Sequence, residues 1–429
     1  MRSLDHPLPA LASALVALAA FLGLQVQAGA QPGVEVPSAS PPLTLAEAIE
    51  LALLQNPEVL AAAQAVRSAR GRVAQARSFS PPSLSLEVEE VTGADPGKAG
   101  VTSLGLAQSF ELGGKRGLRG GAATLEAEAL AVEEERVRRQ VSARVREQYY
   151  LATFLERNTR DLARSVELLE EFAITARARF AAAAVPYLDV VRAQIELSRA
   201  RNDLVEVRRD LAAATAELNL LLGRSGKTPF SLATPLIHEA LGITEEDAVK
   251  KAAEGARLAR TRLRLQAAEA SRRLAGRARI PDVEIAAAAQ RLREGEETTA
   301  AWGAGLALNL PMPWWKAPSG LVQEAEADRD RLRVELAAEE REVESAARVA
   351  FETARAAEAQ VNAFETSILD DAESELGAGI RGYETGAVDA LNLIDIYRTY
   401  VTSRTEYGRS LYLYLSALAR LEVAGDLEL

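Results

Sequence analysis

The sequence predicts a mainly α-helical protein with a small β part, in which long antiparallel helical hairpins carry four strands that cross a membrane. Three observations support this fold class. One order of segments occurs twice, each copy contains two stretches with a period of two residues, and each copy ends in a very long helical pattern.

The first thirty residues have the composition of a secretory signal peptide. Arg2 precedes an apolar run, and small residues surround a predicted cleavage site after Ala28 or Ala30. Asp5 balances the charge of Arg2, so an N-terminal membrane anchor is the alternative interpretation. We assign residues 1–30 to the signal peptide and residues 31–42 to an N-terminal linker.

Composition excludes several classes of function. The 429 residues include no cysteine, which rules out disulfides, thiolate metal sites and a lipidated N-terminus. The formal net charge of −11 argues against a nucleic-acid partner. No nucleophile, acid/base pair or cofactor loop has recognisable spacing, so we expect neither an enzyme nor a cofactor. After the signal peptide no apolar stretch approaches the ~20 residues of a helical membrane span.

The remaining chain contains one design twice. Residues 44–49 (TLAEAI) match residues 244–249 (TEEDAV), and residues 105–107 recur as residues 305–307. A spacing this long indicates a duplicated domain, because stacked solenoid repeats have periods of about 20 to 50 residues. The predicted first repeat, linker and second repeat cover residues 43–223, 224–241 and 242–425.

Each repeat is predicted to begin with a helix. Thr44 and Glu47 have the spacing of a capping box, as do Thr244 and Asp247 in the second copy. The helix is expected to end at Pro81-Pro82 in the first copy and at Pro281 in the second, because a proline ring is incompatible with a helix interior.

Two stretches of alternating apolar and polar residues follow each helix. They cover about residues 83–92 and 101–112 in the first copy, and about 282–292 and 300–310 in the second. Each has roughly ten residues, which is the length of a tilted membrane-crossing strand. One face is apolar and the other is polar or small, so we expect strands that separate lipid from water.

A bend and a helical hairpin complete each copy. Residues that break regular structure mark the predicted bend between strand and helix: Gly113, Gly114, Pro311 and Pro313. Long helical patterns follow and are interrupted at residues 181–186 and 382–386. Each copy is therefore predicted to end in two antiparallel helices.

Such strands cannot remain as open ribbons in lipid, where each unsatisfied backbone group costs several kcal/mol. The smallest single-chain barrels have eight strands, so a chain with four must join other copies, giving eight strands as a dimer or twelve as a trimer. The alternative interpretation is an ordinary soluble β-hairpin attached to a structural coiled coil.

The order of helix, strand pair and long hairpin, present twice between about Leu43 and Gly425, resembles the TolC-type outer-membrane efflux protein family. Residues 108–116 (QSFELGGKR) resemble more narrowly the branch that serves heavy-metal exporters of the resistance-nodulation-division class. This resemblance implies a homotrimer with a shared twelve-stranded barrel in outer-membrane lipid. It also implies a periplasmic helical tunnel that docks on an adaptor (membrane fusion) protein and an inner-membrane pump.

The function implied by this resemblance is the outer-membrane channel of a tripartite efflux system that exports heavy-metal cations from the periplasm. The same channel type serving drug efflux or type I protein secretion is the first alternative. A soluble periplasmic coiled-coil scaffold is the alternative from a different class.

The resemblance also implies a pore aperture where the hairpins turn. Asp189 and Asp395 match its acidic residues, and Tyr383 matches an aromatic residue that ties neighbouring hairpins together. Asn392 stands where a second acidic residue can occur, and Val388 where a basic gate residue can. The alternatives are a helix-start residue for Asp189, a solvated helix face for Asp395 and ordinary packing for Tyr383.

Aromatic residues near the fourth strand suggest contact with the membrane interface: Trp302, Trp314 and Trp315. Packing at the bend is the alternative. His238, in the linker between the repeats, is the only histidine after the signal peptide. With no cysteine in the chain, we expect no tight transition-metal site.

Overall fold

The computed structural model describes residues 42–90, 99–294, 297–310 and 319–427, and the chain from Pro42 onward is one compact unit. Several predictions concern residues outside the described ranges: the signal peptide 1–30, the linker residues 31–41, residues 91–92 of the first predicted strand, Pro311, Pro313, Trp314 and Trp315.

The described elements repeat one order twice, with two helices, two strands and a helical hairpin in each copy. They are β1 (Pro42–Leu43), α1 (Leu45–Gln55), α2 (Pro57–Arg77), β2 (Ser83–Glu90), β3 (Ala99–Phe110), α3 (Lys115–Ala181), α4 (Tyr187–Leu221), β4 (Ser231–Leu232), α5 (Glu245–Glu254), α6 (Ala256–Arg277), β5 (Asp282–Glu294), β6 (Glu297–Asn309), α7 (Ser319–Ala363), the π-helical turn η1 (Phe364–Ile368), α8 (Leu369–Thr385) and α9 (Ala390–Gly425). The expectation of a mainly helical chain with a small β part is confirmed.

The first helix of the first repeat is divided into α1 and α2. Its predicted capping box is confirmed, because the Thr44 hydroxyl accepts a hydrogen bond from the Glu47 amide at 3.2 Å and the Glu47 carboxylate accepts one from the Thr44 amide at 2.8 Å. The break falls at Asn56, since the residue before a proline avoids helical backbone. Its side chain then caps α2 through the Glu58 amide at 2.9 Å. The prediction of one continuous helix is wrong at this residue.

The corresponding helix of the second repeat breaks at Gly255, between α5 and α6. Gly255 offers no side chain to cap α6, and Asp426 at the end of α9 takes that role. The Asp426 carboxylate accepts a hydrogen bond from the Ala256 amide at 2.6 Å and forms an ion pair with Arg139 of α3. A residue at the end of α9 therefore caps α6, the second helix of the same repeat.

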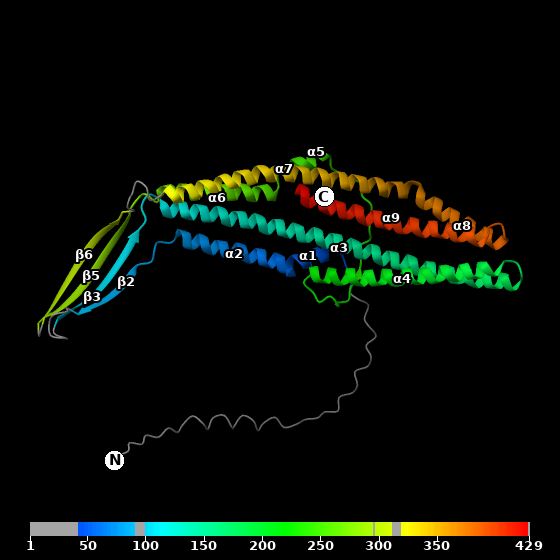
Figure 1. The fold of residues 1–429 in the computed structure, drawn as a ribbon, viewed down its shortest axis with the longest axis horizontal. Coiled ribbons are helices and arrows are strands. Elements are labelled where there is room, and N and C mark those ends of the chain that lie inside the picture. The colour runs from blue at the N-terminus through cyan, green and yellow to red at the C-terminus, as the bar shows by residue number, and fades with distance from the viewer. Residues whose placement is uncertain (1–41, 91–98, 295–296, 311–318, 428–429) are drawn as a thin grey trace, which may run out of the picture. The chain divides into compact units, whose positions relative to one another are not determined.

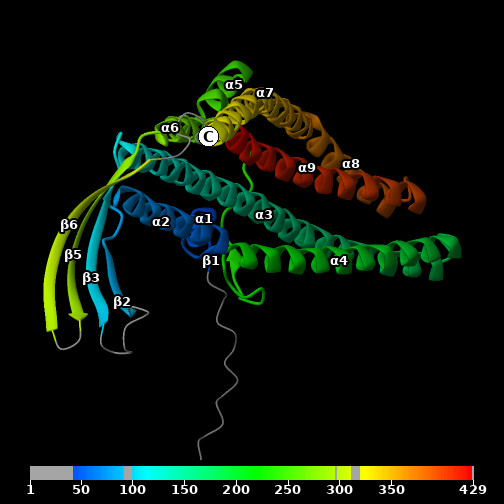
Figure 2. The ribbon, with the colours of Figure 1, turned by 60° about the vertical axis from the view of Figure 1, so that its left-hand side comes forward.

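Four strands form one antiparallel sheet in the order β2-β3-β5-β6. Both hairpins are regular, and β3 pairs with β5 along its whole length, from Ala99 opposite Glu294 to Phe110 opposite Val283. The sheet thus joins the two repeats (Figure 2). The predicted strands differ from the observed ones by up to three residues at their ends, because the alternation of side chains continues weakly into the turns.

The edges of this sheet are open within the chain. Among the described residues, β2 pairs only with β3 and β6 pairs only with β5. Large apolar side chains on these edge strands are strongly exposed, including Leu84, Leu86 and Val88 at 70–74% and Leu306 at 70%. A surface of this kind is unusual for a protein that stays monomeric in water.

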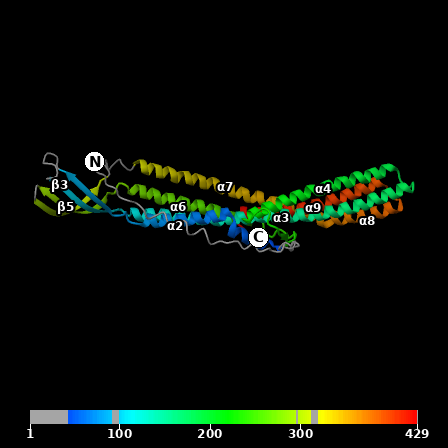
Figure 3. The same cartoon turned by 90° about the horizontal axis from the view of Figure 1, so that it is seen from below.

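Long helices extend from the sheet to the turns of two hairpins at the opposite end of the unit (Figures 1 and 3). α3 has 67 residues and packs against α2, α4, α6 and α9. Its length is ~100 Å at 1.5 Å per residue. Among the helices of the described ranges, none has the combination of length and apolar composition that a membrane-spanning helix requires.

The second hairpin departs from the predicted uninterrupted helix at η1, where one turn contains an extra residue. Glu365 in this turn accepts a hydrogen bond from the Tyr407 hydroxyl at 2.9 Å, and its other oxygen lies 2.9 Å from His238 Nδ1. The linker between the repeats therefore contacts the point at which α7 leads into α8.

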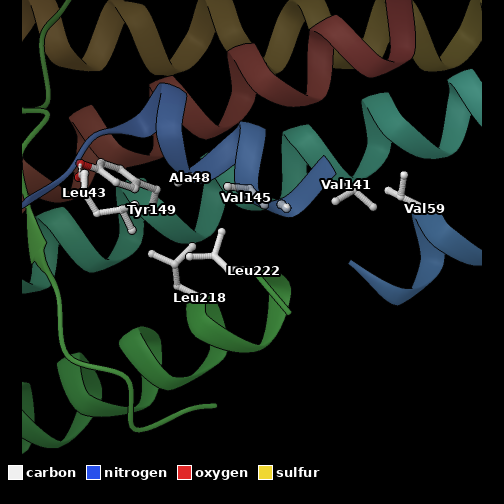
Figure 4. Packing of buried hydrophobic residues seen from close by; sticks show 9 residues of the cluster. Leu43, Ala48, Val59, Val141, Val145, Tyr149, Leu218 and Leu222 are labelled. Atoms are coloured by element: carbon white, nitrogen blue, oxygen red, sulfur yellow. Dashed lines mark hydrogen bonds between the residues drawn. The ribbon is translucent and has the colours of Figure 1, made fainter. Parts of the chain in front are cut away.

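The largest hydrophobic cluster surrounds Tyr149 of α3 (Figure 4). Tyr149 is fully buried, and its hydroxyl donates to the Leu43 carbonyl at 2.8 Å and accepts from the amides of Ala233 and Thr234 at 3.1 and 2.9 Å. Leu218 and other apolar residues pack around the ring. One side chain thus fastens the start of the first repeat and the linker to α3.

Candidate functional site

The turns of the two hairpins lie together at the end of the unit that is farthest from the sheet (Figure 1). In the first hairpin, Ala183 has a φ of 56° and Pro186 directly precedes α4. In the second, Gly386 has a φ of 82°, a conformation that glycine adopts without strain. Asp389 then caps α9 by accepting a hydrogen bond from the Asn392 amide at 2.8 Å. Local sequence thus sets the position of both returning helices.

Asp189 and Tyr383 come from different hairpins, and the Asp189 carboxylate acts electrostatically on the Tyr383 hydroxyl. Asp189 lies in the first turn of α4 and is only 8% exposed. Tyr383 lies in the last turn of α8 and is 3% exposed. Burial raises the pKa of the Tyr383 hydroxyl, and the Asp189 carboxylate contributes in the same direction.

Arg179 of α3 fixes Tyr383 in place. Its guanidinium donates a hydrogen bond to the Tyr383 carbonyl and lies 4.8 Å from the centre of the ring, in cation–π geometry. Phe172 packs edge-on against the same ring, with centroids 5.0 Å apart. The Tyr383 hydroxyl is buried and has no hydrogen-bond partner in the described part of the chain.

Asn392 and Asp395 lie on an exposed face of α9 and do not meet Asp189 within this chain. The Asn392 amide is held by Asp389, and its side chain is exposed. The Asp395 carboxylate lies 3.7 Å from Arg398 and is 62% exposed. These residues are available to an aqueous space or to another copy of the chain.

An ion pair that sequence reasoning missed joins the returning helices. Arg398 of α9 donates two hydrogen bonds to the Glu196 carboxylate of α4, at 2.8 and 2.6 Å. Glu196 is 8% exposed, and the bonds from Arg398 hold the pKa of its carboxyl below the usual range. Each residue lies roughly two turns after the start of its helix. The signal available in the sequence was this pair of opposite charges at similar distances from the starts of the two returning helices.

The predicted bend between strand and helix contains two consecutive residues with positive φ. Gly113 and Gly114 have φ values of 70° and 72°, and a side chain on Gly113 would collide with Ile280. Lys115 then binds across the repeats, donating to the Ile280 carbonyl at 2.6 Å and the Asp282 carboxylate at 2.9 Å. These contacts fix the direction in which α3 leaves the sheet.

Trp302 of β6 is 87% exposed and lies opposite Ala289 in the sheet. The described residues leave its ring largely uncovered, so the ring can contact lipid, water or another chain. Among the described residues there is no group of three or more histidine, aspartate or glutamate side chains that could hold a metal ion.

Comparisons with known proteins agree with this architecture. The family model for outer membrane efflux proteins matches residues 48–224 and 250–424. The cobalt-zinc-cadmium resistance protein CzcC of Cupriavidus metallidurans is 26% identical over 378 residues, which are 86% of each protein. The CusC structure has a TM-score of 0.75 at 16% identity, covering 89% of this chain and 91% of CusC. VceC of Vibrio cholerae also gives 0.75, at 19% identity, covering 89% and 95%.

We predict that removing the Glu196–Arg398 pair loosens the two hairpins from each other. Arg398→Gln should lower the free energy of local opening near the turns by about 1 kcal/mol, since the arginine is partly exposed. Amide hydrogen exchange of α4 and α9 measures this change. Arg201→Gln is the matched control, because Arg201 pairs with Glu170 inside one hairpin. Equal exchange in both variants would contradict the prediction.

The same pair should weaken in acid. Because the pKa of Glu196 is lowered in the folded protein, its contribution is complete above the ordinary glutamate pKa of about 4.3 and is lost as the pH falls through the lowered value. Arg398→Gln should therefore abolish this part of the acid-induced increase in exchange.

Proposed function

The chain belongs to the outer membrane efflux protein family, and from that premise we propose that three copies form one channel that exports heavy-metal cations from the periplasm. The strands form the part in the outer membrane, and the helices extend into the periplasm toward an adaptor protein and an inner-membrane pump. The two open edges of the sheet support this proposal most directly.

Assembly follows from pairing the free edge of β6 in one copy with the free edge of β2 in the next. This contact joins different surfaces, so repeating it produces a ring when the rotation closes. Three copies contribute twelve strands, an even number in the range of known barrels. The backbone groups of every edge strand are then paired, which lipid requires.

The exposed apolar side chains suit the outer face of this barrel. β5 and β6 have 13 residues each, more than the 9–11 that a tilted strand needs to cross a bilayer. Leu86, Val88 and Leu306 would lie in hydrocarbon. We assign Trp302 to the membrane interface, together with Trp314 and Trp315, for which the sequence suggested the same place.

The pore aperture is assigned to the hairpin turns. The exposed carboxylate of Asp395, repeated in three copies, would create a negatively charged ring in a narrow aqueous passage. Asn392 would lie beside it on the same face of α9, while Asp189 and Tyr383 would hold the hairpins in register behind it. Such a ring favours cations over anions.

Heavy-metal cations are the proposed cargo because the relative CzcC is named for resistance to cobalt, zinc and cadmium. The described residues contain no cluster that would bind such an ion tightly. A conduit benefits from this composition, since a tightly chelated ion leaves its site slowly.

We predict that neighbouring copies can be cross-linked through β2 and β6. The chain lacks cysteine, so Leu86→Cys combined in turn with cysteines at positions 302, 304, 306 and 308 adds a unique pair each time. At least one combination should give a ladder that ends at the trimer on a non-reducing gel. Leu86→Cys with Ala287→Cys is the control, because β3 separates these strands. Products that end at the dimer would contradict the proposed stoichiometry.

We predict that Asp395→Ala weakens cation selectivity in planar bilayers. Loss of three negative charges at a constriction should lower the cation-to-anion permeability ratio by about two-fold or more. Asp371→Ala removes the same charge from an exposed position at the start of α8 and should leave the reversal potential unchanged. An unchanged potential in the Asp395 variant would rule out its place at the aperture.

Deleting the gene tests the cargo. We expect increased sensitivity to cobalt, zinc and cadmium ions, with the complemented strain restored to normal growth. Sensitivity to lipophilic drugs, measured on the same plates, should change little. The reverse pattern would refute the metal assignment while leaving the channel assignment intact.

A further inference from the structure

Two arginines of β5 lie on the apolar face of the sheet. Residues directly opposite each other in paired strands project from the same face, so Leu104, Ala289 and Trp302 mark this face in one row. Side chains alternate along a strand, and Arg291 and Arg293 follow Ala289 by two and four residues, which puts them on the apolar face as well. Both side chains are exposed, and neither forms an ion pair or a hydrogen bond with the described residues.

The carboxylates of the strands project from the opposite face. Each of them lies next, along its strand, to a residue of the apolar face: Glu87, Glu89, Asp282, Glu284 and Glu297. In the ranges 83–89, 100–110, 282–293 and 297–309, whose side chains the structure describes, the apolar face carries no carboxylate. A guanidinium stays charged at any physiological pH. The counter-charge of the two arginines therefore comes from the medium that covers this face.

The composition of the apolar face changes in a fixed order with distance from the helices. Asp282 at the start of β5 is bound to Lys115 at the start of α3, so β5 begins beside the helices and ends away from them (Figure 2). Aliphatic side chains come first along this face, the exposed ring of Trp302 follows, and Arg291 comes next. At ~3.4 Å per residue, Arg291 stands about 7 Å beyond the row of Trp302. The polar layers of a bilayer add about 5 to 8 Å on each side of the hydrocarbon.

Hydrogen-bond donors surround the two arginines. Thr102 lies opposite Arg291 and Thr298 lies opposite Arg293, each with an exposed side chain. Gly100, the neighbour of Arg293 on β3, has no side chain and leaves space beside the guanidinium. Guanidinium and hydroxyl groups donate hydrogen bonds, and the oxygens of a phosphate accept them. The cluster is thus suited to a phosphate group that approaches from the apolar side of the sheet.

We propose that this cluster binds the phosphate of an anionic lipid in the membrane leaflet farther from the helices. This inference rests on the proposed placement of the sheet in the outer membrane. The acyl chains pack on the apolar face beside Trp302, and the phosphate lies between Arg291 and Arg293. Every copy in the ring carries one such cluster at the same level. Bound lipid therefore fixes the depth of the barrel in the bilayer, since basic residues are attracted to anionic headgroups.

The fluorescence of Trp302 in reconstituted vesicles tests this proposal. The chain has three tryptophans, so Trp314→Phe with Trp315→Phe leaves Trp302 as the only one in the full-length protein. The vesicles consist of phosphatidylcholine with a small fraction of brominated lipid, either phosphatidylglycerol or phosphatidylcholine, because bromine quenches a tryptophan only at close range. Brominated phosphatidylglycerol should bind beside Trp302 about fivefold more tightly, the factor that one basic residue at an anionic surface supplies.

Arginine variants separate this cluster from the overall charge of the protein. Arg291→Gln combined with Arg293→Gln should abolish the preference for the anionic lipid, whereas lysine at both positions should retain it. Arg67→Gln combined with Arg70→Gln is the matched control, because it removes the same two charges from exposed positions on α2. Quenching by brominated phosphatidylcholine should be equal in all variants, which verifies that each has entered the bilayer.

Two results would overturn the proposal while brominated phosphatidylcholine still quenches Trp302: equal binding of the two lipids, or a preference that survives the Arg291 and Arg293 substitutions. Inorganic phosphate that displaces the anionic lipid more strongly than chloride at equal ionic strength would also overturn it, by assigning the cluster to a soluble anion. Absence of any quenching by brominated phosphatidylcholine would contradict the placement of the sheet in lipid, and the inference would fail with it. The two failures are therefore distinguishable.

Discussion

The backbone groups along the outer edges of β2 and β6 set the constraint on which the rest of this structure depends. Inside the sheet, β3 and β5 have partners on both sides. Within the described ranges, each edge strand has a partner on one side only, and large apolar side chains on both edge strands are exposed. In the proposed assembly, this sheet is one section of a larger closed structure. The duplication builds this sheet, because each repeat supplies one β-hairpin and the pairing of β3 with β5 joins the two hairpins.

The direction of the helices follows from the same sheet. Consecutive glycines at 113 and 114 turn the chain sharply, and Lys115 attaches the start of α3 to the neighbouring repeat. α3 then contacts α2, α4, α6 and α9, so both repeats share one central helix. Tyr149 adds the linker and β1 to it through three hydrogen bonds. The hairpin turns are thereby held far from the sheet, where charged side chains meet water.

Patterns that depend on neighbours in the chain were readable from the sequence. Alternating side chains in the strands and the Thr44 capping box appear where they were predicted. The break at Asn56 was also encoded locally, by the proline that follows, and only the helical pattern on both sides obscured it. η1 was not readable from neighbouring residues, and its Glu365 contacts His238 and Tyr407, which come from distant segments. The Glu196–Arg398 pair has the same origin: two charges 202 positions apart become neighbours only after both hairpins have packed.

The capping of α6 by Asp426 links the order of synthesis to the order of folding. The capping residue, Asp426, lies 170 positions after Ala256, whose amide donates the hydrogen bond. Until the end of α9 has been synthesised, the N-terminus of α6 lacks this acceptor. A chain that must cross one membrane before reaching another gains from this delay, because a translocation pore admits extended polypeptide. The contacts of Asp426 with Ala256 and Arg139 can form only after the end of α9 has been synthesised, so this part of the second repeat is completed last.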